Sequence, residues 1–178
     1  MLTPDNTLLL VVDIQERLLP VLHQNTEFTA ACRHMIEGAN ILDVAIAITE
    51  QYPKGLGATL PEIITLIPDA PIFAKTRFSA WIDEIHAIVR ARQPENVILI
   101  GCETHICVLQ TALDMRDAGL NVYVPQECVT SRTIENKING LEQMRAAGAI
   151  ISNIESLLFM LMQDAKHPHF KEISQLIQ

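Results

Sequence analysis

No stretch of this 178-residue chain approaches the ~18 consecutive apolar residues that a membrane-spanning helix needs. The apolar run at residues 8–12 is short, has no basic residue before it and ends in an acid, so we expect no signal peptide. Repeats, low-complexity segments and internal linkers are also missing. With 49% hydrophobic and 19% charged residues, the chain is predicted to fold as a single domain over residues 1–178.

Basic residues are too few to balance the acidic ones. Thirteen Lys and Arg stand against 21 Asp and Glu, which gives a net charge of −8. Such a chain is not attracted to the phosphates of nucleic acids or of anionic membranes. We therefore expect no nucleic-acid and no membrane partner, and a small molecule is the expected ligand.

Cysteine is sparse as well, with four residues at positions 32, 102, 107 and 128. Four cysteines in a chain of this length do not form the dense pattern of a disulfide scaffold. Cytoplasmic localisation is the expected setting, because reducing conditions there would preserve a reactive thiol.

The patterns that bind metals and nucleotides are missing too. His167 and His169 form an H-x-H pair with no third ligand in view, and the other histidines lack ligand spacing. The first strand is followed by DIQERLLP rather than by a Gly-rich phosphate loop, which argues against a flavodoxin-like nucleotide binder. We expect no metal and no cofactor.

Apolar, strand-like runs alternate with segments of helical period along the chain. Strands are predicted at residues 8–13, 43–49, 71–75, 97–101, 121–125 and 149–152. Helical segments are predicted at residues 27–39, 80–92, 105–118, 133–147, 156–163 and 170–177. This alternation predicts a three-layer α-β-α fold, doubly wound around a mainly parallel six-stranded sheet of the Rossmann-like type.

Cys107 is the most informative single residue. It follows the apolar run 97–101 and a polar break, and it lies in the first turn of a predicted amphipathic helix. Unpaired N–H groups and the helix dipole at that end predict a lowered thiol pKa and a reactive cysteine. The alternative is an ordinary buried thiol.

Two other ionisable residues, Asp13 and Lys75, also follow apolar strands. In a parallel sheet all strand carboxyl ends lie at one edge, where ligands bind, so Asp13, Lys75 and Cys107 are predicted to converge there. Gln15, Phe78 and Trp81 flank the first two and are the candidate walls of a substrate pocket; core packing is the alternative for the aromatic residues. A competing Cys107–His105 dyad is disfavoured, because residues two apart do not share a helix face.

Three segments then resemble the signatures of the isochorismatase-like cysteine hydrolase family: VVDIQ, FAKTRFSAW and IGCETHICVLQTALDMRDAGLNVYV. ITEQYPKGLGATLPEI and HPHFKEI resemble its small, single-domain branch. The resemblance covers about residues 6 to 175 and keeps the order of the signatures.

The resemblance implies a Cys–Asp–Lys triad, carried here by Cys107, Asp13 and Lys75. It implies a non-proline cis peptide at Cys102–Glu103 and an oxyanion hole made by the backbone N–H groups of Glu103 and Cys107. It also favours homo-oligomers. The nicotinamidase branch has an Asp-x-His metal motif where this chain reads EQYPK at 50–54, which argues against a metal and against nicotinamide.

True isochorismatases lack a nucleophilic cysteine at the position of Cys107, so cleavage of isochorismate is not expected. The sequence predicts a cofactor-free cysteine hydrolase that cleaves a small amide or related C–N bond through a thioester intermediate. The alternative is a catalytically silent module on the same fold that binds a small molecule or a protein.

Overall fold

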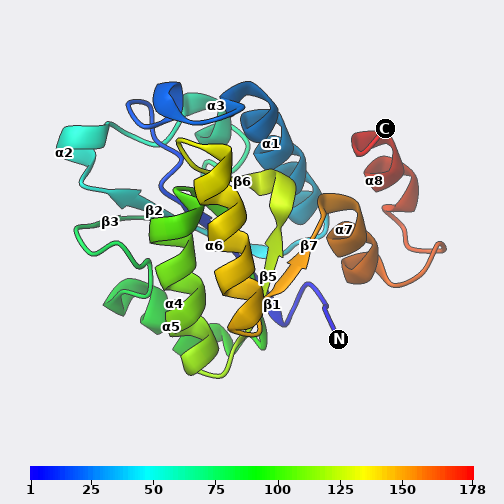
Figure 1. Ribbon diagram of the computed structural model, residues 1–178. Coiled ribbons are helices and arrows are strands. Elements are labelled where there is room, and N and C mark those ends of the chain that lie inside the picture. Colours follow the sequence, from blue (N-terminus) through cyan, green and yellow to red (C-terminus); the bar gives the residue numbers. More distant parts are fainter.

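The central sheet of the computed structural model, which describes all 178 residues, has seven strands that pair only in parallel (Figure 1). Its order is β3-β2-β1-β4-β5-β7, and β6 pairs with β4. The strands are β1 (Thr7–Val12), β2 (Ala45–Gln51), β3 (Ile72–Lys75), β4 (Asn96–Cys102), β5 (Asn121–Pro125), β6 (Val129–Thr130) and β7 (Ile150–Ser152). The six predicted strands are confirmed. The seventh, β6, is two residues long and has no apolar period to predict it.

Eight α-helices and three shorter helical turns connect the strands. The α-helices are α1 (Asn25–Ile41), α2 (Pro53–Leu56), α3 (Pro61–Ile64), α4 (Asp83–Arg92), α5 (Leu109–Asp117), α6 (Ile134–Ala146), α7 (Ile154–Met162) and α8 (Phe170–Leu176). The shorter turns are η1 (Leu19–Val21), η2 (Thr104–Val108) and η3 (Gln126–Cys128). None of these helices combines the length and the apolar character required to cross a bilayer.

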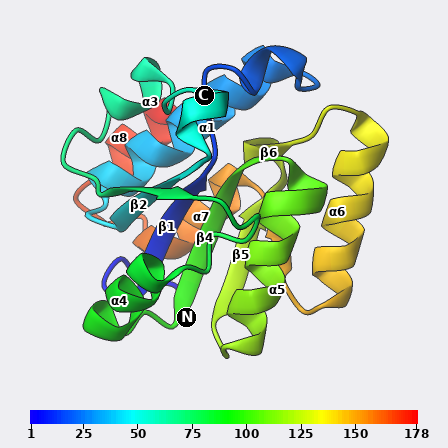
Figure 2. The same ribbon diagram turned by 90° about the vertical axis from the view of Figure 1, so that its left-hand side faces the viewer.

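Helices cover both faces of the sheet, which confirms the three-layer arrangement (Figures 1 and 2). Side chains from α1, α3, α7 and α8 join one buried cluster, and side chains from α4, α5 and α6 join the other. Along β1, Leu9 and Val11 point into the first cluster and Leu8, Leu10 and Val12 into the second. Coverage of both faces explains why this strand is a continuous apolar run rather than an alternating one.

The C-terminal tail packs on its own domain. Its helix α8 contacts α1, its Ile173 is fully buried, and the Phe170 ring meets the Phe159 ring edge-on at 6.0 Å. The apolar residues that recur at helical spacing in the tail therefore pack within the same chain.

The carboxyl ends of β1, β2, β3 and β4 are level with one another. Val12 pairs with Thr49 on one side and with Gly101 on the other, and Gln51 pairs with Lys75. Gly101 has φ +147°, and a Cβ there would lie 2.0 Å from the Val12 carbonyl oxygen. Only glycine lets the end of β4 approach β1 this closely. This approach brings the residues that follow the two strands together.

Candidate active site

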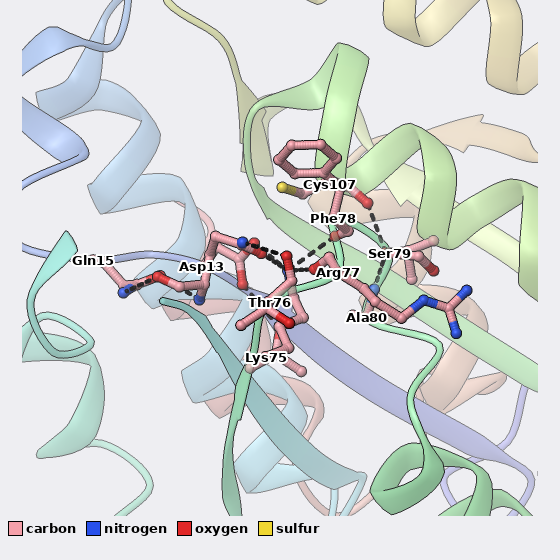
Figure 3. Close-up of polar contacts among 12 residues, drawn as sticks. Asp13, Gln15, Lys75, Thr76, Arg77, Phe78, Ser79, Ala80 and Cys107 are labelled. Atoms are coloured by element: carbon pink, nitrogen blue, oxygen red, sulfur yellow. Dashed lines mark hydrogen bonds and ion pairs between the residues drawn. The ribbon is translucent and has the colours of Figure 1, made fainter. Parts of the chain in front are cut away.

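A buried ion pair joins the ends of β1 and β3 (Figure 3). The Lys75 Nζ lies 2.7 Å from the Asp13 Oδ2, and both side chains are almost completely excluded from solvent. Asp13 has φ +58°, and its N–H donates to the Thr49 carbonyl at 3.0 Å. This left-handed turn, which aspartate tolerates better than most residues, places the carboxylate at the sheet edge.

Lys75 also organises its surroundings. Its ammonium lies 2.9 Å from the Gln51 Oε1, 3.2 Å from the Arg77 carbonyl and 2.9 Å from the Phe78 carbonyl. The Thr49 hydroxyl donates to the Asp13 Oδ1 at 3.1 Å. Thr49 and Gln51 on β2 were not predicted from the sequence, since their strand gives no chemical signal beyond its period.

Burial raises the pKa of Asp13, while the Lys75 charge and the hydrogen bonds from Lys75, Cys107 and Thr49 lower it in part. The carboxylate is therefore more basic than an exposed one but is still opposed by a cation. A base of this kind can take a proton from a neighbouring acid.

Cys107 lies in η2, a π-helical turn that leads into α5. The Cys107 thiol and the Asp13 carboxylate each shift the pKa of the other, so the three predicted residues lie close together (Figure 3). The Thr111 hydroxyl donates to the Cys107 carbonyl at 2.6 Å and accepts from the Ala80 N–H at 2.8 Å. Thr111 thereby connects the turn that carries Cys107 to the segment after β3.

The predicted lowering of the Cys107 pKa is wrong. Burial and then the Asp13 charge raise the pKa of this thiol to about 12, against an opposing effect of Lys75. The end of a helix favours a thiolate, but desolvation of the buried thiol opposes it and is the larger effect here. Cys107 is thus a neutral thiol beside a base, and its deprotonation requires that base.

The predicted cis peptide at Cys102–Glu103 is also wrong, because the chain contains no cis peptide bond. Glu103 instead adopts a left-handed conformation, with φ 56° and ψ 65°. Its carbonyl accepts from the Ile106 N–H at 2.9 Å and from the Val108 N–H at 3.4 Å. The left-handed residue turns the chain sharply enough without a cis bond and directs this carbonyl into the helix.

The Glu103 side chain, in the turn before Cys107, is also buried. Its Oε1 lies 2.9 Å from the Arg132 Nε, and its Oε2 lies 3.5 Å from the His105 Nδ1. The same His105 nitrogen is 3.0 Å from the Ser131 Oγ. Because Ser131 and Glu103 share one ring nitrogen, the three do not form a proton relay. No residue pattern marked Arg132 or Ser131 in the sequence.

The three candidate pocket walls have different environments. The Gln15 amide is buried and bonds to main-chain atoms of Gln51 and Gly57, so it supports a loop. Phe78 is 54% exposed, and its carbonyl is held by Lys75. Trp81 packs edge-on against the His86 ring at 4.2 Å.

Two open cavities flank the segment after β3, and Arg77 lines both. The larger has a volume of about 490 Å³ and is lined by Tyr52, Pro53, Lys54, Ala74, Lys75, Thr76, Arg77, Ile82 and Glu84. The other, of about 320 Å³, lies between residues 77–79 and α5. No three His, Cys, Asp or Glu side chains lie together in a cluster able to hold a metal ion.

Comparison with known proteins gives a consistent result. The isochorismatase domain model matches residues 7–156. The secreted isochorismatase effector Isc1 of Phytophthora sojae is 38% identical over 99% of this chain and 87% of its own length. Isochorismatase domain-containing protein 1 of Danio rerio is 36% identical over 99% of this chain, which spans only 62% of that protein.

Solved structures agree with this match. A MAR1 ribonuclease from Caenorhabditis elegans has a TM-score of 0.95 at 38% identity, covering 99% of this chain and 91% of its own. The YcaC gene product of Escherichia coli, described as an octameric hydrolase of unknown specificity, has a TM-score of 0.89 at 22% identity over 99% and 94% of the two chains, and at that identity it supports the fold alone. From the domain match and the identities of these relatives it follows that the chain belongs to the isochorismatase family.

Proposed function

We propose that this family member is a cysteine hydrolase that cleaves a small amide or a related C–N bond. Cys107 is the nucleophile, Asp13 the general base and Lys75 the counter-ion of that base. The observation that carries the proposal is the buried ion pair of Lys75 and Asp13 at one sheet edge, with the buried Cys107 thiol near enough to shift the pKa of Asp13. A neutral thiol and a basic carboxylate are the resting forms that such a mechanism needs.

In the first half of the reaction, Asp13 accepts the thiol proton as the Cys107 sulfur attacks the substrate carbonyl. With a thiol pKa of about 12, the proton transfer accompanies the attack, because a free thiolate is scarce at neutral pH. Asp13 then gives the proton to the leaving amine, and the acyl group stays on Cys107 as a thioester.

In the second half, Asp13 takes a proton from water, and the resulting nucleophile attacks the thioester. The tetrahedral intermediate expels the Cys107 sulfur and releases the carboxylic acid, and Asp13 returns its proton to that sulfur, which regenerates the thiol. Throughout the reaction the Lys75 ammonium holds the carboxylate in place. Its charge also opposes the rise in the pKa of Asp13 that burial causes. None of these steps calls for a metal or a cofactor.

Each tetrahedral intermediate carries an oxyanion. We propose that the backbone N–H groups of Glu103 and Cys107 form the oxyanion hole that stabilises it. No backbone carbonyl accepts the Glu103 N–H, and the Glu103 carbonyl is occupied by Ile106 and Val108. Each such donor contributes on the order of 3 kcal/mol to a transition state. Phe78, Trp81 and Gln15 remain our proposed pocket residues, with Gln15 acting through the loop it supports.

An activity screen tests the proposal. Small amides are incubated with the wild type, with Cys107→Ala as the blank and with Asp13→Asn. We expect turnover in the wild type, near-complete loss in both variants, and an acyl adduct on Cys107 by mass spectrometry. Turnover that survives Cys107→Ala would sink the proposed chemistry, whereas ligand binding without turnover would favour a silent binding module.

A second substrate class enters the screen because the Caenorhabditis elegans neighbour is named a ribonuclease. We rank RNA below small amides, since a net charge of −8 opposes its binding and Cys107 is only 5% exposed. Cleavage of an RNA oligonucleotide that is lost in Cys107→Ala would reverse this ranking.

We also propose that the protein is a cytoplasmic homo-oligomer. The resemblance to the family favours the assembly, and the Escherichia coli YcaC product, which shares the fold, is itself described as octameric. Four free cysteines, with no disulfide among them, fit a reducing compartment.

A further inference from the structure

The turn that precedes Cys107 follows β4, and the end of β4 is paired with the short strand β6. β6 pairs with the end of β4 through Gly101↔Val129 and Cys102↔Thr130. The residues after β6 then reach the turn itself. The Arg132 Nε lies 2.9 Å from the Glu103 Oε1, and the Ser131 Oγ lies 3.0 Å from the His105 Nδ1.

Glu103 needs this support. It is a non-glycine residue in the left-handed region, and such residues persist only where their surroundings hold them. Its side chain is 9% exposed, and its Oε2 has no hydrogen-bond partner but lies 3.5 Å from the His105 Nδ1. Arg132 is the one Lys or Arg within 4 Å of this carboxylate. α6 packs on the other side of the turn through Gly140 but brings no Lys or Arg within 4 Å of Glu103.

Three charged groups act on the Cys107 thiol from three strand ends. The Asp13 charge raises the pKa of Cys107, the Lys75 charge lowers it, and the Glu103 charge raises it. Arg132 is 55% exposed and pairs with Glu103 at 2.9 Å, so it offsets the last of these charges. Removal of Arg132 leaves a buried carboxylate uncompensated near the nucleophile.

We propose that Arg132 is a positioning residue of the active site, which acts on Cys107 through the Glu103 carboxylate by fixing the turn and neutralising its charge. The inference rests on the proposed function, because it takes Cys107 as the nucleophile. It adds to the triad a residue 25 positions further along the chain that reaches no substrate.

The test is the rate at which iodoacetamide alkylates Cys107 at pH 8, read by peptide mass. Arg132→Met is expected to slow this rate about threefold, equal to half a pH unit, because the thiol becomes harder to ionise. Glu103→Gln is expected to accelerate it by about the same factor. Arg132→Lys restores most of the wild-type rate.

Arg33→Met is the matched control, because Arg33 is a similarly exposed arginine that pairs with Glu37 and Glu62 away from the site. It is expected to leave the alkylation rate unchanged, and circular dichroism verifies folding of every variant. If Arg132→Met and Glu103→Gln change the rate in the same direction, or Arg132→Met leaves it unchanged, the proposal is overturned.

Alkylation requires no substrate. A failed amide screen therefore leaves the Arg132 measurement readable, and an unchanged alkylation rate leaves the amide screen readable. The two proposals fail by different observations.

Discussion

At the Asp13–Lys75 pair each side chain is the counter-ion of the other, and neither reaches solvent. Two such charges are costly to bury, and their attraction and hydrogen bonds compensate that cost only while both are present. Lys75 has acceptors from β1, β2 and the segment after β3, so its loss affects three parts of the sheet edge.

Lys75→Met is expected to destabilise the protein by about 3–5 kcal/mol, because it leaves the Asp13 carboxylate buried without a cation. Urea unfolding measures this loss. The double variant Asp13→Asn/Lys75→Met removes both charges and is expected to recover part of it. A double variant less stable than Lys75→Met would show that the charge imbalance is not the cause.

The thiols differ in access as well as in environment. Cys107 is 5% exposed, whereas Cys32, Cys102 and Cys128 are 0% exposed. We expect iodoacetamide to modify Cys107 first in the folded protein. Thiolate is the deprotonated form, so with a pKa of about 12 the rate rises as pH rises, about tenfold per unit between pH 7 and 10.

Peptide mass spectrometry identifies the labelled residue at each pH, and Cys107→Ala supplies the background. Preferential labelling of Cys32 or Cys128, or a rate that levels off below pH 9, would contradict the environment described for Cys107.

Between elements, α6 packs tightly against η2, the turn that carries Cys107. A Cβ on Gly140 would lie 2.9 Å from the backbone of Thr104 and His105, and a backbone atom cannot rotate away. Gly38 on α1 differs, since its Cβ would meet only the Leu158 side chain. The two helical glycines are therefore a matched pair.

Gly140→Ala is expected to cost about 1–3 kcal/mol of stability, despite alanine's better helix propensity, because α6 must move away from η2. It is also expected to change the alkylation rate of Cys107. Gly38→Ala should leave that rate unchanged, because its clash lies on the other face of the sheet. Equal effects of the two variants on Cys107 would remove the special role of the α6–η2 contact.

The proximity of Asp13, Lys75 and Cys107 was predictable, because each follows an apolar run and parallel strands bring such positions together. Arg132 was not predictable, because β6 is too short for a period and its pairing with β4 depends on the whole fold. The Cys107 pKa and the Cys102–Glu103 peptide were predicted wrongly for a related reason. Both depend on burial and backbone geometry that neighbouring residues alone do not reveal.

Across the whole molecule, α8 packs on α1 through the buried Ile173, so the tail reaches its own chain. The monomer has a mass of 19.8 kDa. In multi-angle light scattering at micromolar concentration we expect at least twice this mass, as befits the proposed oligomer. A mass near that of one chain would refute the assembly. The activity of the monomer would then be measured.

The Lys75 ammonium donates to the backbone carbonyls of Arg77 and Phe78 and makes no hydrogen bond to their side chains. Every amino acid has a backbone carbonyl, so the side chains at 77 and 78 can be exchanged without removing an acceptor from the ammonium. In the proposed mechanism, substrate preference and bond-breaking chemistry are therefore separable at this edge of the sheet. Random libraries at these two positions are a rational place to seek altered selectivity, since the Asp13 and Lys75 charges stay in place.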